Sequence, residues 1–199
     1  MDDFFNEERF ERWVKVSVGL DRFNKHLPSI LLGLSVMDID LYKKDLELVE
    51  KYKEGGDATK DYGSESESVS GSLKRHLTYS YLWVLGAYEF VRTITLSIKD
   101  RKDEDFKDKE VFEKLTKTKN LFTRLRVPLA KLEAARYHEK TDFMIAYPGI
   151  DCDVGIAWQV NENLVISRQK LSDLFLETLE FMRSRKWSRV PNEDSLQSA

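Results

Sequence analysis

The chain has little of several features that mark whole classes of protein. It has 199 residues and a single cysteine, Cys152, so one chain can form neither an intramolecular disulfide nor a cysteine-based zinc site. Four prolines and nine glycines exclude collagen-like and proline-rich designs. The sequence also lacks a run of about 18 apolar residues, the length that a transmembrane helix needs. We therefore expect a cytoplasmic protein that makes no membrane contact and lives in a reducing compartment.

The charges are almost balanced. Lys and Arg number 32 against 35 Asp and Glu, and the net charge of -3 lacks the basic excess of a general nucleic-acid binder. Hydrophobic residues make up 41% of the chain, which is enough to build a core and excludes a wholly disordered protein. We expect one domain over residues 1–186, followed by a polar C-terminal tail over residues 187–199.

Apolar residues recur at helical spacing in most of the chain, which predicts a mainly helical bundle of about five helices. Between the second and third helices, residues 55–71 are rich in Gly, Ser and charge and predict a flexible surface linker. Pro128 falls inside the fourth helical pattern and predicts either one kinked helix or two helices that meet near Val127. The expected helices run from about Asp3 to Leu27, from Pro28 to Tyr52, from Leu73 to Lys99, from Glu110 to Tyr137 and from Ser167 to Met182.

The period changes over residues 143–166, which predict a small β-hairpin or meander inserted before the last helix. We expect strands at 143–147 and 154–160, a turn at Pro148 and Gly149, and a short third strand at 164–166. Tyr147, Ile156 and Trp158 put large side chains on this small element. A hairpin has two faces and the helices cover one of them, so these three residues are the predicted interface with a partner protein or a second copy in a homodimer.

No strong catalytic motif is present: the sequence has no phosphate-binding loop, no dinucleotide fingerprint and no zinc-protease motif. Cys152 lies between Asp151 and Asp153 without a cationic neighbour, unlike a reactive cysteine. We predict no metal and no cofactor. These observations favour a binding protein over an enzyme.

Charged residues inside apolar helices indicate a candidate ligand site. Glu89 and Arg92 lie three residues apart in the most hydrophobic helix, and a buried charge requires a partner. We therefore predict that Glu89 is buried and paired with an arginine. The cluster is interpreted either as a salt-bridge network that joins two helices or as a pocket for an anionic ligand. The candidate ligand-binding residues are Tyr88, Glu89, Arg92, Arg126 and Lys131.

Two further basic groups keep a nucleic-acid alternative open. Arg22 and His26 share one face of the predicted first helix at i, i+4, which makes them candidates for catalysis in a metal-independent ribonuclease or RNA-binding protein. Near the C-terminus a basic cluster either complements the end of the last helix or binds phosphate, with Trp187 as a stacking platform. That cluster contains Arg183, Arg185, Lys186 and Arg189. The favoured function is protein–protein binding and assembly, and the nucleic-acid function is the alternative.

Overall fold

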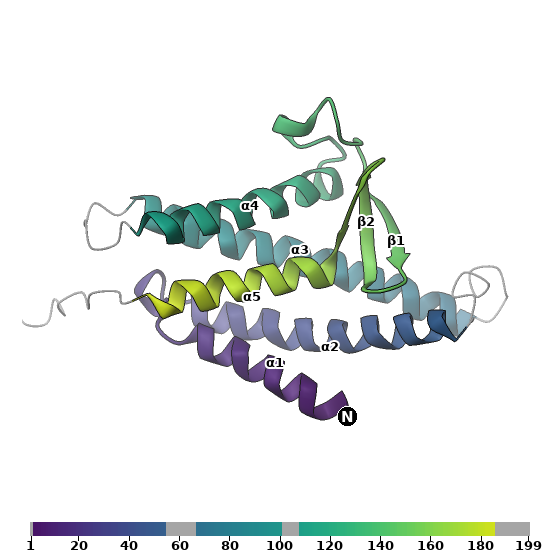
Figure 1. Cartoon of the computed structure of the whole chain (residues 1–199), viewed down its shortest axis with the longest axis horizontal. Coiled ribbons are helices and arrows are strands. Elements are labelled where there is room, and N and C mark those ends of the chain that lie inside the picture. The colour runs from purple at the N-terminus through teal and green to yellow at the C-terminus, as the bar shows by residue number, and fades with distance from the viewer. Residues whose placement is uncertain (1, 55–66, 101–107, 186–199) are drawn as a thin grey trace, which may run out of the picture.

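A computed structural model describes residues 2–54, 67–100 and 108–185. Within these ranges the chain forms five α-helices and a three-stranded antiparallel sheet between the fourth and fifth helices (Figure 1), which confirms the predicted fold class. The helices are α1 (Asp2–Ser17), α2 (Leu27–Lys53), α3 (Glu67–Asp100), α4 (Lys109–Ala130) and α5 (Arg168–Ser184). The strands are β1 (Tyr147–Asp151), β2 (Gly155–Asn161) and β3 (Leu164–Ser167), and two short 3-10 helices are η1 (Leu20–Arg22) and η4 (Arg136–His138).

The first helix ends ten residues earlier than its apolar pattern predicts. Gly19, two residues after Ser17, has a φ of 83°, a left-handed conformation that interrupts an α-helix. The chain then makes η1 and starts α2 at Leu27, where Pro28 occupies the first turn as expected. The prediction of one helix to Leu27 is therefore wrong, because a glycine ends it before the proline does.

The predicted linker is shorter at its C-terminal side than the composition indicates. Residues 67–71, which we assigned to the linker, form the first turn of α3. The rest of the linker, residues 55–66, and the tail at 187–199 lie outside the described residues.

Asp108 begins α4 as its N-cap and accepts a hydrogen bond from the Val111 amide at 3.1 Å.

The proline of α4 lies near the end of the helix and does not kink a longer one. α4 stops at Ala130, two residues after Pro128, and Leu132 adopts a left-handed conformation with φ of 58°. The predicted helical continuation to Tyr137 is therefore wrong. Instead, the chain turns through η4 toward the sheet.

The sheet has the order β1-β2-β3, and its first strand begins later than predicted. Pro148 and Gly149, which we predicted to form the turn, lie inside β1 opposite Trp158 and Ala157, and the turn occupies residues 152–154. The Ile156 amide donates to a carboxylate outside the sheet, so it points away from β1. The amide of its partner Ile150 therefore points away from β2, toward the open edge of the sheet. Amide directions alternate along a strand, so the nitrogen of Pro148, two residues earlier, faces the same open edge. A proline is tolerated there because no ladder hydrogen bond is lost.

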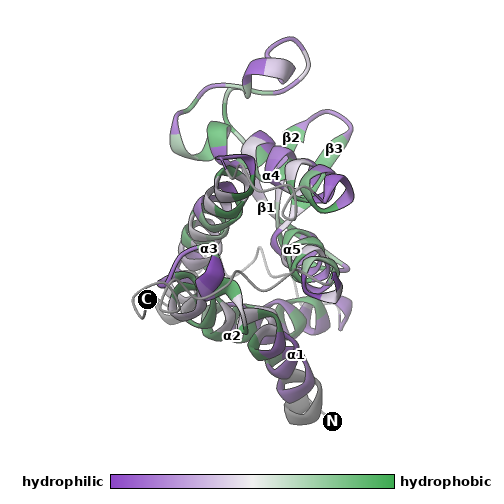
Figure 2. Ribbon diagram, turned by 90° about the vertical axis from the view of Figure 1, so that its left-hand side faces the viewer, coloured by the Kyte–Doolittle hydropathy of each residue, from purple (hydrophilic) through white to green (hydrophobic). Residues whose placement is uncertain are grey.

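The core is organised around Phe175 of α5. Its ring makes edge contacts with Trp13 of α1 at 5.3 Å, Phe90 of α3 at 5.6 Å and Phe122 of α4 at 6.0 Å between ring centroids. Seen along the bundle, α5 lies across from α3 with the other helices around them (Figure 2). Ile156 and Trp158 of β2 join this same core, which places the inner face of the sheet against the helices. None of the described helices has the length and apolar character needed to cross a membrane.

Candidate functional site

The predicted ligand site between α3 and α4 separates into small surface contacts. Glu89 is exposed, with 49% of its side chain accessible, and it accepts a hydrogen bond from Arg92 at 2.7 Å on the same helix. The prediction that Glu89 is buried is therefore wrong, because it lies on the solvent side of a helix whose opposite faces carry the core. Arg126 stacks over the Tyr88 ring at 5.2 Å, and Lys131 pairs with a neighbouring glutamate in its own loop.

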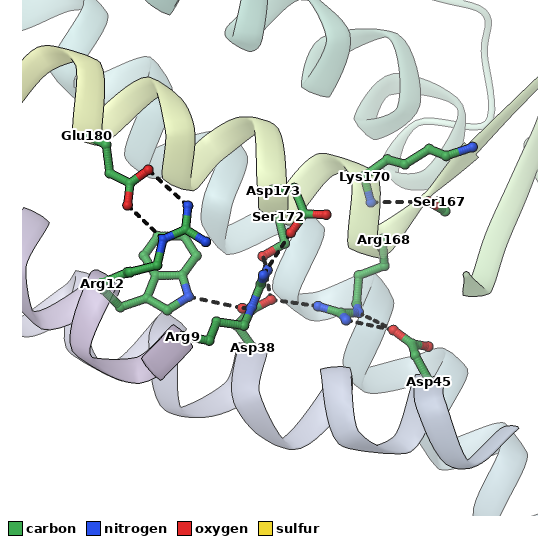
Figure 3. A network of polar contacts seen from close by, with 11 residues as sticks. Arg9, Arg12, Asp38, Asp45, Ser167, Arg168, Lys170, Ser172, Asp173 and Glu180 are labelled. Carbon is green, nitrogen blue, oxygen red and sulfur yellow. Dashed lines mark hydrogen bonds and ion pairs between the residues drawn. The ribbon is translucent and has the colours of Figure 1, made fainter. Parts of the chain in front are cut away.

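The extensive polar cluster that the structure does form was not predicted from the sequence. It is centred on Asp38 and Asp45, which lie two turns apart on the buried face of α2. Arg168, the first residue of α5, inserts between them and is completely inaccessible to solvent. Its guanidinium donates to Asp38 at 2.6 Å and twice to Asp45, at 2.6 and 2.9 Å (Figure 3). A cation at a helix N-terminus interacts unfavourably with the positive end of the helix dipole. The two carboxylates offset this repulsion and thus account for the position of Arg168.

Asp38 is the most densely bonded carboxylate of the cluster. One oxygen accepts from Arg168 and Ser172, and the other accepts from Arg9 Nε at 2.8 Å and from the Trp13 indole at 3.0 Å. Burial alone would raise the pKa of Asp38, but the charges of Arg168 and Arg9 and the bond from Ser172 hold it below its ordinary value. The carboxylate is therefore ionised and paired inside the bundle.

Asp45 connects the cluster to the sheet. Its second oxygen accepts the Ile156 amide at 3.0 Å. β3 ends opposite Ala157, so its backbone offers no acceptor to the Ile156 amide. The Asp45 carboxylate supplies that acceptor instead. His76 Nε2 of α3 lies 3.2 Å from the same oxygen but makes no hydrogen bond with it or with any other described residue.

The four most deeply buried charges of the cluster balance one another and are closed to solvent. Asp38 and Asp45 balance Arg9 and Arg168, and all four side chains are at most 6% exposed. Arg9 also reaches Asp173 of α5 at 2.7 Å, which joins α1 to α5. A solute cannot reach these groups in this conformation, so the arrangement serves to fix α1, α2, α5 and β2 relative to one another and offers no accessible site for catalysis.

A second ion pair attaches α4 to the segment that precedes β1. Arg124 donates two hydrogen bonds to Asp142 at 2.6 and 2.7 Å, and Asn161 donates a third at 2.9 Å. The bonds from Arg124 lower the pKa of Asp142 to about 2, against the opposing effect of burial. The two residues of this pair lie 18 positions apart in the chain.

The proposed catalytic pair does not share a helix face. Arg22 belongs to η1, whereas His26 is the exposed residue before α2. Because Gly19 ends α1, the i, i+4 spacing loses its structural meaning, and the expectation of a common face is wrong. The fold instead brings Arg22 to a pocket that Arg183 and Arg185 of the predicted basic cluster also line.

The predicted interface residues divide into buried and exposed side chains. Ile156 and Trp158 are buried in the core and offer nothing to a partner, which corrects the expectation that they form part of an interface. Tyr147 is 56% exposed and stands on the outer face of the sheet, beside a hollow of about 260 Å³. The turn that follows β1 groups the donor atoms of Asp151, Cys152 and Asp153 within 4.8 Å at the surface, and the thiol is free.

One feature of the sequence indicates the buried cluster around Asp38 and Asp45. Asp38 and Asp45 fall seven residues apart on the face of α2 that also carries Leu31 and Leu41, so two acids interrupt an apolar stripe. Nothing in the sequence indicated that Arg168 is their partner. Comparison of the chain with protein-family models, curated proteins and solved structures finds no match, so its function is inferred from its own residues.

Proposed function

We propose that this chain is a cytoplasmic assembly protein that binds a second copy of itself through the outer face of its sheet. The observation that supports the proposal is a group of exposed apolar side chains on the sheet and on the segment just before it, two of which line one hollow. Met144 is 68% exposed, and Ile145, Tyr147 and Val165 are also exposed. Such a group in one small region of the surface is typical of a protein–protein contact.

The hollow has a small-residue floor. Gly149 and Ala157 face each other across β1 and β2 on the outer face, and Tyr147, Gln159 and Val165 stand beside them. The same face therefore carries a projecting ring and a hollow next to it. In a twofold contact one patch meets its own copy, so the ring of each protomer has a hollow to enter. This self-complementarity favours a homodimer over a contact with a different protein.

The edge of the sheet gives less support to an alternative contact by strand addition. β1 lies at the edge of the sheet, but Pro148 presents no amide hydrogen to an added strand. The proposed contact therefore uses side chains on the sheet face and not backbone hydrogen bonds along the edge. The exposed thiol of Cys152 nearby is compatible with a reducing compartment.

The test fills the hollow without harming the monomer. A Cβ added at Gly149 meets no atom within 4 Å, so Gly149→Val should leave the fold intact and even add about 0.5–1 kcal/mol of stability. In a dimer the same methyl groups occupy the space that the partner's tyrosine needs. Sedimentation velocity at high micromolar concentration should show a dimer for the wild type and a monomer for Gly149→Val.

Two comparisons keep the test specific. Tyr147→Asp should also dissociate the dimer, whereas Tyr79→Asp, at a similarly exposed tyrosine on α3, should not. A wild type that is monomeric at high micromolar concentration would refute the homodimer. A dimer that persists in both Gly149→Val and Tyr147→Asp would place the interface elsewhere.

A further inference from the structure

The second pocket lies at the opposite end of the bundle from the sheet, where α1 and η1 meet the last turn of α5. It has a volume of about 250 Å³. Three of its lining residues are arginines, none is acidic, and the others are mostly apolar. Residues far apart in the chain, such as Arg22 and Arg183, thus form one basic pocket in a protein whose net charge is negative.

Arg22 is held in place by the turn it belongs to. Its Nε donates to the Gly19 carbonyl at 2.5 Å. The guanidinium lies so close over Gly19 that a Cβ at that position would collide with it, and the φ of 83° there already favours glycine. The glycine thus ends α1 and also makes room for the arginine at the wall of the pocket. An arginine fixed in this way loses little side-chain entropy when it binds a ligand.

The other two arginines differ in their surroundings. Arg185 stacks on the Phe181 ring at 4.5 Å and pairs with Glu110 and Asp108 of the α4 start, so its charge is partly neutralised. Arg183 is exposed in the last turn of α5 and pairs with no acid within the described part of the chain. Its guanidinium has room to turn toward a ligand in the pocket.

The chemistry of the pocket selects a class of ligand. A planar guanidinium binds two oxygens of a phosphate at once and does so better than an ammonium group. The floor of the pocket, which includes Leu20 and Met182, suits an apolar or aromatic group attached to that phosphate. We propose that this pocket binds a nucleotide, with its phosphate on Arg22 and Arg183.

The experiment measures binding of a fluorescein-labelled oligouridylate by anisotropy at low salt, with uridine monophosphate as a competitor. Arg183→Gln removes one exposed charge without touching the core and should weaken binding roughly tenfold, the size expected for one charge-assisted phosphate contact. Arg75→Gln is the matched control, since Arg75 is also an exposed helical arginine, at the far end of α3. Thermal melting of both variants should match the wild type.

Competition with uridine monophosphate distinguishes a free nucleotide from single-stranded nucleic acid as the ligand. If uridine monophosphate displaces the strand and Arg183→Gln weakens both, the pocket takes free nucleotides. If only the strand binds, and Arg183→Gln weakens it, the ligand is single-stranded nucleic acid. The proposal is overturned if neither probe binds, or if Arg75→Gln weakens binding as much as Arg183→Gln, because the affinity is then a property of total charge. An unchanged affinity in Arg183→Gln overturns it as well, and leaves the arginines as a cover for the helix ends.

Discussion

Arg168→Met tests whether the buried network holds the bundle together. Methionine has a similar length and no charge, so the variant removes three hydrogen bonds and one buried cation with little change in volume. Asp38 keeps Arg9, but Asp45 is left with the Ile156 amide and no arginine. Breaking a buried ion pair on one side typically costs about 3–5 kcal/mol. Against a total stability of about 5–15 kcal/mol, such a loss is readily measured.

The assay is urea unfolding followed by far-UV circular dichroism, with Arg12→Met as the control. Arg12 also makes two hydrogen bonds to one carboxylate, Glu180 of α5, but both side chains are more than a third exposed. That pair should contribute no more than about 1 kcal/mol. The two variants therefore compare the same chemistry in a buried and in a solvated setting.

A second substitution separates the stranded charge from the lost packing. Asp45→Asn in the Arg168→Met background removes the unpaired carboxylate charge and should recover about 1 kcal/mol or more. The reasoning is refuted if Arg168→Met costs no more than Arg12→Met. It is also refuted if the double variant is as unstable as the sum of the two single variants, since the two residues would then act independently.

Three further predictions concern stability. Asp142 has a pKa of about 2 in the folded protein against an ordinary 3.8, so its contribution of about 2 kcal/mol is present above pH 3.8 and is lost as the pH falls toward 2. Asp142→Asn should therefore be less stable at neutral pH and lose less in acid, which urea unfolding across pH measures, and an unchanged acid slope would contradict it. Gly33→Ala, in open space on α2, should raise the unfolding free energy by about 0.5–1 kcal/mol, whereas Gly19→Ala should lower it, and equal melting temperatures would contradict both. Glu89→Ala should change stability by less than about 0.5 kcal/mol, because its pair with Arg92 is exposed; a loss of 3 kcal/mol would restore the buried interpretation.

Local patterns in the sequence were sufficient for most of the elements. The helical spacing of apolar residues located α2 and α5 closely and also the end of α3, although α3 begins at Glu67 and not at the predicted Leu73. The change to a period of two located β2 and β3. Pro28 and Ser167 lie at helix starts as their chemistry predicts. Pro28 has no amide hydrogen to leave unpaired in the first turn, and the Ser167 hydroxyl accepts a hydrogen bond from the Lys170 amide. These are contacts between residues close in the chain, which a single sequence records.

The errors at element ends have a common cause. Gly19 and Leu132 adopt left-handed conformations that end α1 and α4, and nothing in the apolar pattern reports a backbone angle. Pro148 lies inside a strand because its nitrogen faces an open edge, and the position of an edge depends on which strands pair. The sequence favoured a turn there because the same dipeptide is a common turn signal.

Only the tertiary structure decided which charges are buried. Glu89 lies among apolar neighbours in the sequence and is exposed, whereas Asp38, Asp45 and Arg168 lie among polar and apolar residues alike and are buried together. A charge enters a core only when a partner from another element meets it there, and Arg168 is 123 residues from Asp45. The same holds for the arginine pocket, where Arg22 and Arg183 converge because α1 and α5 pack side by side. Periodicity identifies which face of a helix is apolar, but the pairing of distant faces is a property of the folded chain.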